Sequence, residues 1–362
     1  MTYDFAYEAN PMRVRFGAGS LSALADELDH LGLRRVLVLC SPSQKGTAER
    51  IASMLGDRCV GVRADAVMHV PSEVAKRSSA EVLSLGADGC VTVGGGSSIG
   101  LGKAIALVHG LPIVAVPTTY AGSEMTPVWG LTTDGHKETG RDIRVLPRSV
   151  VYDPELTTGL PVDISVTSGV NAVAHAVEAL YAPDISPIVA LMAEDGVRAL
   201  ASALPAIVAD HLDPQARSDA LYGAWLCGAT LGATTMSLNH KLCHSLGGTL
   251  NLPHAPTHTV VLPHVLAFNQ SAAPSAVTAL SRALPGSGDP ATRLWELCRR
   301  LGAPRSLAEL GMKEKDIDRI ADDVTSRSYG NPRPVTREAA TAILHAAWAG
   351  DPPTDIGQRE RP

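Results

Sequence analysis

This 362-residue chain has no closely paired cysteines, no excess of basic charge and no apolar run among its first residues. Its six cysteines form no Cys-X-X-Cys pair, and four of them lie in apolar or helix-like runs. This pattern excludes a disulfide framework and is typical of reduced thiols. The N-terminal segment MTYDFAYEANPMRVRFG contains two early acidic residues and no apolar stretch, unlike a signal peptide. We therefore expect a cytoplasmic protein.

The charge balance excludes further classes of partner. Lysine and arginine number 31 against 37 aspartates and glutamates, which gives a formal net charge of -6. Without a basic surface, nucleic acid is not an expected ligand. The uncharged residues 220–239 reach the length of a membrane span, but Gly, Thr, Ser and Asn dilute them, so we expect a buried helix and no membrane contact.

The length and the hydrophobic pattern predict two domains of different character. At about 100 to 200 residues per domain, 362 residues suffice for two. Up to residue 156, β-branched runs such as RRVLVLCS and LPIVAVPTT alternate with helical runs such as TAERIASMLGD. Strands alternating with helices of this length predict an α/β domain with a parallel sheet, Rossmann-like and suited to nucleotides, over residues 1–156.

Helical periodicity dominates the rest of the chain. It is clear in VDISVTSGVNAVAHAVEALYA, PQARSDALYGAWLCGATLG and TREAATAILHAAWAG, while strand signals nearly vanish. We place the boundary near Leu156 to Pro161, where proline and glycine interrupt the pattern. The sequence thus predicts an all-helical catalytic domain over residues 157–352, followed by a polar, proline-rich tail, 353–362, that we expect to be disordered.

A glycine-rich turn in the first domain suits a phosphate. It follows a buried strand, opens a helix and contains Gly94, Gly95, Gly96, Ser97 and Ser98. Glycines let backbone amides approach an anion, and the helix N-terminus adds positive potential. The turn departs from the G-X-G-X-X-G fingerprint, and a tight turn without a ligand is the structural alternative.

Two other strand ends support a dinucleotide site. Thr118, Thr119 and Ser123 follow the next strand in VPTTYAGSE, and ligands of open parallel sheets bind beyond the carboxyl ends of strands. At the end of the first strand stands Ser41, where many cofactor domains have an acidic residue for the adenosine ribose. Since a neutral residue neither clamps a 2′-hydroxyl nor repels a 2′-phosphate, both NADH and NADPH are expected cofactors.

Five of the twelve histidines lie within residues 240–264, a density that indicates chemistry. His240 and His244 are four residues apart, as are Asn171 and His175, so each pair shares one helical face. A metal site could take two ligands from one helix, one from a second and one from the loop beyond, where His254 stands.

The motifs GGGSS, PTTYAGSE, NAVAHAVEA, HKLCH and LPHAPTHTVVLPH, in this order, resemble the iron-containing (group III) alcohol dehydrogenase family, which has a dehydroquinate synthase-like fold. The family's metal ligands are an aspartate and three histidines. By this resemblance they correspond to Asn171, His175, His240 and His254, with His244 near the substrate. Because Asn171 offers a neutral amide in place of a carboxylate, divalent metal affinity should fall, and no metal is expected to be required.

One branch of the family is matched more closely across residues 1–350. The runs GHKETGRDIRVLPRSVVYDPEL and YGNPRPVT look like those of maleylacetate reductases, which convert maleylacetate to 3-oxoadipate with NADH or NADPH during aromatic degradation. The resemblance implies an oxidoreductase that reduces the double bond of an enone. It also implies a homodimer.

The reduction of such a substrate requires cations for its carboxylates and groups that stabilise and protonate an enolate. A substrate with two carboxylates requires cations, for which Lys241, Arg144 and Arg333 are candidates; a solvated surface cation is the alternative for Arg333 and for the neighbouring Arg141. Hydride addition would create an enolate, which imidazoles of His240, His244 or His254 could stabilise and protonate. Which histidine gives the proton stays open. His258 and His264 are interpreted as partners of loop carbonyls.

Two other functions compete with this interpretation. One is a metal-dependent alcohol dehydrogenase or carbonyl reductase of the same family, against which Asn171 argues. The other is a non-catalytic NAD-binding protein, against which the retained histidines argue. Metal analysis with assays on maleylacetate and simple aldehydes separates the three.

Overall fold

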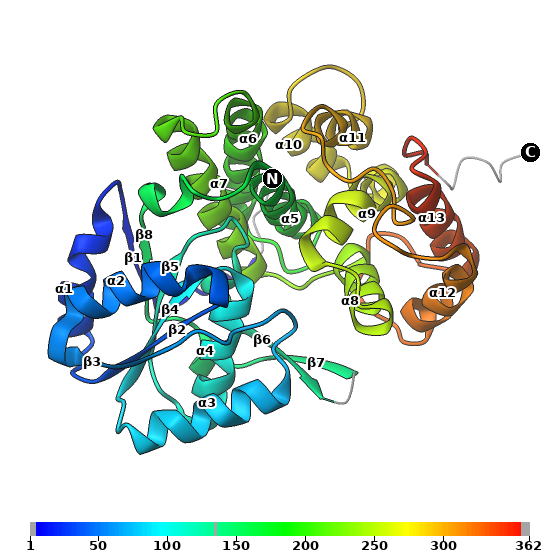
Figure 1. The fold of residues 1–362 in the computed structure, drawn as a ribbon. Coiled ribbons are helices and arrows are strands. Elements are labelled where there is room, and N and C mark those ends of the chain that lie inside the picture. Colours follow the sequence, from blue (N-terminus) through cyan, green and yellow to red (C-terminus); the bar gives the residue numbers. More distant parts are fainter. Residues whose placement is uncertain (1–4, 134–135, 356–362) are drawn as a thin grey trace, which may run out of the picture. The chain divides into compact units, whose positions relative to one another are not determined.

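The structure is a computed structural model that describes residues 5–133 and 136–355 (Figure 1). The chain divides into two compact units. The sheet unit is Ala9–Leu160, and the helical unit is Pro161–Pro362 together with Met1–Glu8. The division falls after Leu160, whereas the first domain expected from the sequence ended at residue 156. Most of the predicted disordered tail, residues 356–362, lies outside the described residues.

A parallel sheet forms the centre of the sheet unit. Its six strands have the order β1-β8-β5-β4-β2-β3, and every neighbouring pair is parallel. The strands are β1 Arg13–Phe16, β2 Val36–Cys40, β3 Cys59–Arg63, β4 Gly89–Gly94, β5 Ile113–Pro117 and β8 Ser149–Tyr152.

Helices cover both faces of this sheet because its strands are apolar on both sides. Along β2, Val36 and Val38 pack in one hydrophobic cluster with the helices α1 and α2, whereas Leu37 and Leu39 pack in a second cluster with α3 and α4. This is the period-two alternation of a strand that is buried twice. The helices are α1 Leu24–His30, α2 Lys45–Leu55, α3 Ser72–Ser84 and α4 Gly96–His109.

The sequence did not predict strands β1 and β8 of the sheet, nor a hairpin outside it. Strands β6, Val128–Thr133, and β7, His136–Arg141, pair antiparallel as a separate two-stranded sheet. No residue of β6 is fully buried, and its sequence VWGLTT lacks the continuous apolar run that marks the central strands. The hairpin depends on its own pairing and on the contacts of β6 with α3 and α4.

The helical unit confirms the predicted all-helical second half, and with the parallel sheet it confirms the predicted fold class. It contains α5 Val162–Leu180, α6 Pro187–Ala209, α7 Pro214–Ala233, α8 Leu238–Leu250, α9 His254–Asn269, α10 Pro274–Ala283, α11 Pro290–Arg300, α12 Ile317–Thr325 and α13 Arg337–Ala349. The uncharged stretch 220–239 forms the later part of α7 and the start of α8 rather than one helix. None of the described helices is long and apolar enough to cross a membrane.

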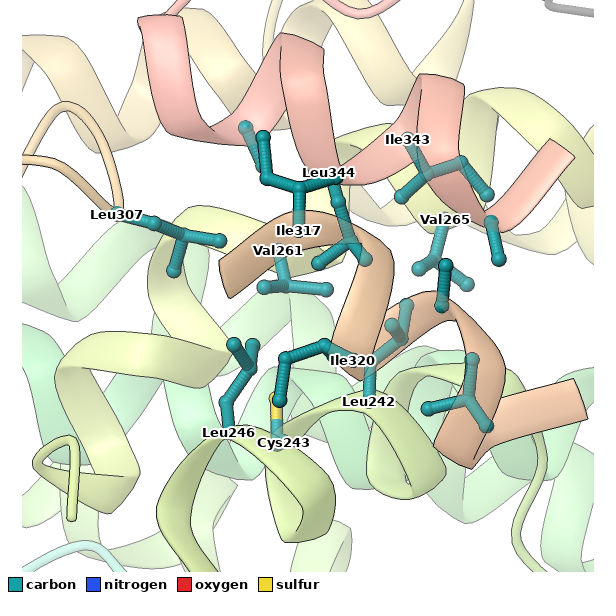
Figure 2. Packing of buried hydrophobic residues seen from close by; sticks show 14 of the residues in the cluster. Leu242, Cys243, Leu246, Val261, Val265, Leu307, Ile317, Ile320, Ile343 and Leu344 are labelled. Atoms are coloured by element: carbon teal, nitrogen blue, oxygen red, sulfur yellow. The ribbon is translucent and has the colours of Figure 1, made fainter. Parts of the chain in front are cut away.

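A hydrophobic cluster holds α8 and α9 against α12 and α13 (Figure 2). Leu242, Cys243 and Leu246 on α8 pack in it with Ile320 on α12, and none of the four side chains is exposed. The cluster therefore fixes one face of α8, whose other side chains include His240 and His244.

We expect Ile320→Ala to destabilise the protein by about 2–5 kcal/mol, because it removes buried methyl groups and leaves a cavity. Urea unfolding followed by circular dichroism measures the change. Leu191→Ala is the control, since Leu191 is 71% exposed and its truncation should change the free energy of unfolding by less than about 0.5 kcal/mol. Equal effects of the two changes would contradict the assigned core.

Candidate active site

The glycine-rich turn and the threonine turn meet at one edge of the sheet. Strand β4 lies between β2 and β5, and Gly94 at its end pairs in register with Pro117. The amide of Thr118 donates a 3.1 Å hydrogen bond to the carbonyl of Gly94. The carboxyl ends of adjacent parallel strands thus bring the two predicted turns together.

Two glycines of the turn are required by close packing. A Cβ at Gly95 would lie 2.7 Å from Oγ1 of Thr119, and one at Gly94 would lie 2.6 Å from Oγ of Ser98. Gly94 also has a φ of +134°, which side-chain-bearing residues rarely adopt. The absence of side chains at these two positions lets the turns approach each other closely.

Gly96 differs, because it opens α4 and a Cβ there would meet no atom within 4 Å. It is exposed, while the buried hydroxyls of Ser98 and Thr118 have no hydrogen-bond partner among the described residues. An open helix N-terminus with nearby hydroxyl donors is a suitable cradle for a phosphate. These residues fit the pyrophosphate of a dinucleotide.

Ser41 directly follows β2, the strand next to β4, and its hydroxyl lies 3.0 Å from that of Ser43. The position predicted to meet the adenosine ribose is therefore occupied by a small neutral group at the same edge of the sheet.

Lys103 on α4 was missed by the sequence analysis. Although almost fully buried, its ammonium donates to the carbonyl of Ser123 at 2.7 Å, to Oγ1 of Thr126 at 2.9 Å and to the carbonyl of Val128 at 2.7 Å. Burial lowers the pKa of Lys103 to about 7, against the opposing effect of the carboxylate of Glu124. Lys103 ties the threonine turn and the start of β6 to the helix that begins at the glycine turn.

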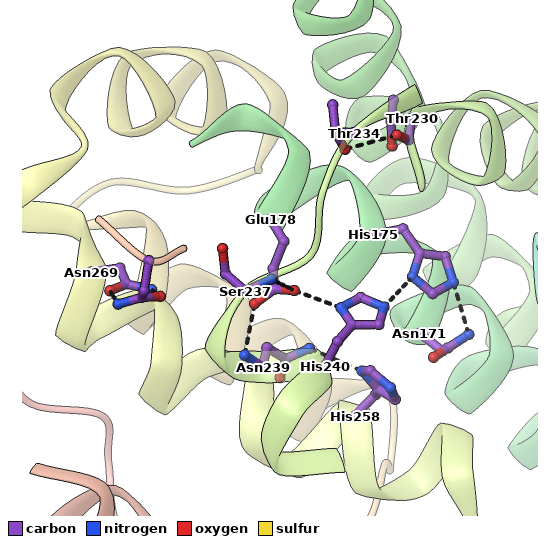
Figure 3. A network of polar contacts seen from close by, with 11 residues as sticks. Asn171, His175, Glu178, Thr230, Thr234, Ser237, Asn239, His240, His258 and Asn269 are labelled. Atoms are coloured by element: carbon purple, nitrogen blue, oxygen red, sulfur yellow. Dashed lines mark hydrogen bonds and ion pairs between the residues drawn. The ribbon is translucent and has the colours of Figure 1, made fainter. Parts of the chain in front are cut away.

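In the helical unit, three residues of the two predicted pairs, Asn171, His175 and His240, form one chain of hydrogen bonds (Figure 3). Nδ2 of Asn171 lies 3.3 Å from Nε2 of His175, and Nδ1 of His175 lies 2.9 Å from Nε2 of His240. All three residues are at most 5% exposed. Asn171 and His175 come from α5 and His240 from α8, so the site is assembled from two helices.

Glu178 ends this chain and was also missed. Its Oε2 lies 2.6 Å from Nδ1 of His240, and the carboxylate is fully buried. The sequence did contain a signal: Asn171, His175 and Glu178 are spaced by four and three residues, which places all three on one face of α5. A carboxylate beside an imidazole orients the ring and selects its tautomer.

His258 lies in the cluster rather than beside a loop carbonyl, which corrects the sequence interpretation. It is on α9, its Nδ1 lies 2.9 Å from Nδ2 of Asn239, and its ring centroid is 4.7 Å from that of His240 and 4.5 Å from that of His254. Burial, with smaller contributions from the neighbouring histidines, lowers the pKa of His258 well below its ordinary value. His264 is also buried on α9, and burial lowers its pKa to about 4.

His244 and His254 are the more accessible histidines of the cluster. His254 was expected in a loop, but it is the first residue of α9, which begins directly after Pro253. Both rings are half-buried, and they stack with centroids 6.2 Å apart at an interplanar angle of 21°. The two side chains can therefore approach one ligand together.

Lys241 is also half-buried and stands on α8 between His240 and His244. Within the part of the chain that the structure describes, it forms no ion pair. Its ammonium is therefore available to an anion.

The predicted arginines have other contacts. Arg144 is exposed in the sheet unit and bound by both oxygens of Asp142. Arg333 donates to the carbonyl of Phe268 at 2.7 Å, pairs with Asp355 at 2.9 Å and stacks over the Phe268 ring. Arg141 is exposed at the end of β7. Their role toward a substrate carboxylate stays a prediction.

At two of the ligand-equivalent positions, His175 and His240, the ring nitrogens as placed are not directed at a metal ion. His175 and His240 bind each other through ring nitrogens, and Asn171 presents its amide nitrogen to His175. Within residues 5–133 and 136–355, no group of three or more His, Cys, Asp or Glu side chains is arranged to hold a metal. A ligand nitrogen needs a lone pair directed at the cation, which these contacts occupy.

Most of the chain matches one family of proteins. Residues 11–154 match the model of the iron-containing alcohol dehydrogenases, and residues 165–348 match that of the C-terminal part of the same family. The chain therefore belongs to the iron-containing alcohol dehydrogenase family, and the predicted family is confirmed.

The similar proteins include several maleylacetate reductases. One from Burkholderia cepacia is 55% identical over 350 residues, which are 97% of this chain and 99% of that protein. The crystal structure of a maleylacetate reductase from Agrobacterium tumefaciens has a TM-score of 0.93 at 49% identity, and that of one from a Rhizobium species has a TM-score of 0.92 at 50% identity. Each match covers 97% of this chain and 100% of the other.

A methyl group at Gly96 tests the predicted phosphate cradle. We expect Gly96→Ala to weaken NADH binding about tenfold or more without lowering Tm, because the added carbon meets no protein atom but occupies the approach to the amides. Fluorescence titration with NADH measures the Kd. Gly46→Ala on α2, where a Cβ also meets nothing within 4 Å, should leave the Kd unchanged. A Kd for NADH in Gly96→Ala equal to that of the wild type would show that the phosphate binds elsewhere.

Proposed function

We propose that this protein is an NAD(P)H-dependent maleylacetate reductase that forms 3-oxoadipate. The observation that carries the proposal is the similarity to maleylacetate reductases, at 55% identity over 97% of the chain. The glycine turn supports a dinucleotide, and the histidine cluster supports chemistry on an oxygen-bearing substrate.

The reaction is a conjugate reduction. Hydride from the nicotinamide adds to the alkene carbon that is β to the ketone, the double bond shifts, and negative charge develops on the ketone oxygen. A proton then reaches the α carbon and gives the saturated product. The protein has to stabilise the enolate and supply the proton.

His244 and His254 are the residues we assign to these tasks. The ring nitrogens of His175 and His240 are engaged along the chain from Asn171 to Glu178. His244 and His254 are half-buried and adjacent, so they can donate to an oxygen in a partly dehydrated site. No step of this mechanism requires a metal.

Lys241 provides the cation for a substrate carboxylate. It is half-buried and three residues before His244 on α8, so the two side chains leave the same side of the helix. An ammonium on a flexible stem reaches an anion without a fixed direction of approach. Lys241 can therefore hold a carboxylate while His244 contacts the ketone oxygen.

The proposal also includes the cofactor preference, the location and the oligomeric state. Ser41 favours use of both NADH and NADPH, since it brings neither a negative charge nor a clamp for the 2′-hydroxyl. A cytoplasmic homodimer acting in aromatic degradation follows from the family resemblance and stays a prediction.

The deciding experiment measures oxidation of NADH and of NADPH by the purified protein with maleylacetate. We expect turnover that is the same with and without EDTA. Metal-dependent turnover of simple aldehydes, without activity on maleylacetate, would favour an alcohol dehydrogenase instead. Tight NADH binding with no turnover of any enone diacid would favour a non-catalytic protein.

Histidine variants test the assigned roles. We expect His244→Ala and His254→Ala each to lower kcat/KM for maleylacetate by about 10²–10⁴-fold, because each removes a group that stabilises or protonates the enolate. The Kd for NADH should not change. His345→Ala is the matched control, since His345 is exposed on α13. Full activity in both site variants would contradict the assignment.

A further inference from the structure

Glu178 connects the histidine chain to the start of a helix. Its Oε1 accepts from the amide of Asn239 at 2.7 Å, and its Oε2 accepts from the amide of Ser237 at 3.0 Å. Ser237 is the N-cap of α8 and makes no capping bond with its own side chain. Glu178, on α5, therefore caps α8 from outside and is stabilised by the positive end of that helix.

The three contacts of Glu178 also indicate how it meets His240. Each carboxylate oxygen already accepts from a backbone amide, Oε2 from Ser237 and Oε1 from Asn239. Glu178 therefore acts as the acceptor toward Nδ1 of His240 as well.

Figure 3 shows the contacts of the chain from Glu178 to Asn171. The acceptor at Glu178 sets the direction of each of these bonds. Since Nδ1 of His240 donates to Glu178, Nε2 of neutral His240 is an acceptor and takes the hydrogen on Nδ1 of His175. Nε2 of His175 is then also an acceptor and takes a hydrogen from Nδ2 of Asn171. With His240 neutral and the amide of Asn171 oriented as placed, each bond of the chain joins a donor to an acceptor only when both histidines carry their hydrogen on Nδ1.

We infer that Glu178 is a positioning residue that holds His175 and His240 as Nδ1–H tautomers and sets α8, with Lys241 and His244, in place for the reaction. The effect of Glu178 on kcat rests on the proposed function, whereas the tautomers of His175 and His240 do not depend on it. His240 is the third residue of α8, so one carboxylate fixes both the helix start and the ring.

Glutamine at this position cannot make all three bonds. If its oxygen faces Ser237 and His240, its NH₂ group opposes the amide of Asn239. If its oxygen faces Asn239 instead, its NH₂ group opposes the amide of Ser237 and requires His240 to accept at Nδ1, which reverses the chain. Glu178→Gln therefore leaves a buried donor unmatched in either orientation.

The test is ¹⁵N–¹H NMR of the full protein labelled at histidine, combined with kinetics. In the wild type, we expect His175 and His240 to be Nδ1–H tautomers, identified by loss of the signals in His175→Gln and His240→Gln. In Glu178→Gln, we expect these signals to change and kcat for maleylacetate to fall about tenfold to a hundredfold, with KM altered less. Glu178→Asp, which keeps the carboxylate, should partly restore the wild-type histidine signals and kcat.

Glu27→Gln is the control, since Glu27 is also buried but lies in the sheet unit and accepts from Ser149. It should leave the histidine signals unchanged. An Nε2–H tautomer at His240 in the wild type would overturn the inference even if Glu178→Gln fails to fold, and so would unchanged signals and kcat in a folded Glu178→Gln. Absence of maleylacetate turnover in the wild type with the expected tautomers would instead overturn the proposed function alone.

Discussion

Buried polar groups have to find their hydrogen-bond partners inside the protein, and this constraint organises the histidine cluster. Three imidazoles, His175, His240 and His258, are buried together with the carboxylate of Glu178. An unmatched donor or acceptor in such a place costs about 1–3 kcal/mol. The observed contacts pair most of these groups with one another and with Asn171 and Asn239, so their tautomers and orientations are coupled. Nε2 of His258 has no hydrogen-bond partner among the described residues.

The two units solve the problem of ligand binding in different ways. In the sheet unit, glycines expose the backbone at the ends of parallel strands, and Lys103 holds the second turn through its carbonyls. In the helical unit, side chains provide the chemistry that we propose, and the cluster around Ile320 holds the helices that position them. Backbone amides suit a cofactor shared by many proteins, whereas side chains suit one particular substrate.

Much of the fold was predictable because its signals are local. Alternating β-branched strands and helices predicted the parallel sheet, and the long helical periodicities predicted the second unit. The β6–β7 hairpin was not predicted, since its residues form no strong apolar run. Lys103 and Glu178 were missed because a charged residue in a helical pattern is usually exposed, and only the packing shows that these two are buried.

The sequence by itself determined the family, the glycine turn and the histidines near α8, because these depend on residue types at short spacing. It also showed that Asn171 stands where the family has a carboxylate. Only the tertiary structure decided that His175 and His240 bind each other and that Glu178 orients them. Those contacts join residues 62 and 65 positions apart, and no local pattern encodes which nitrogen faces which partner.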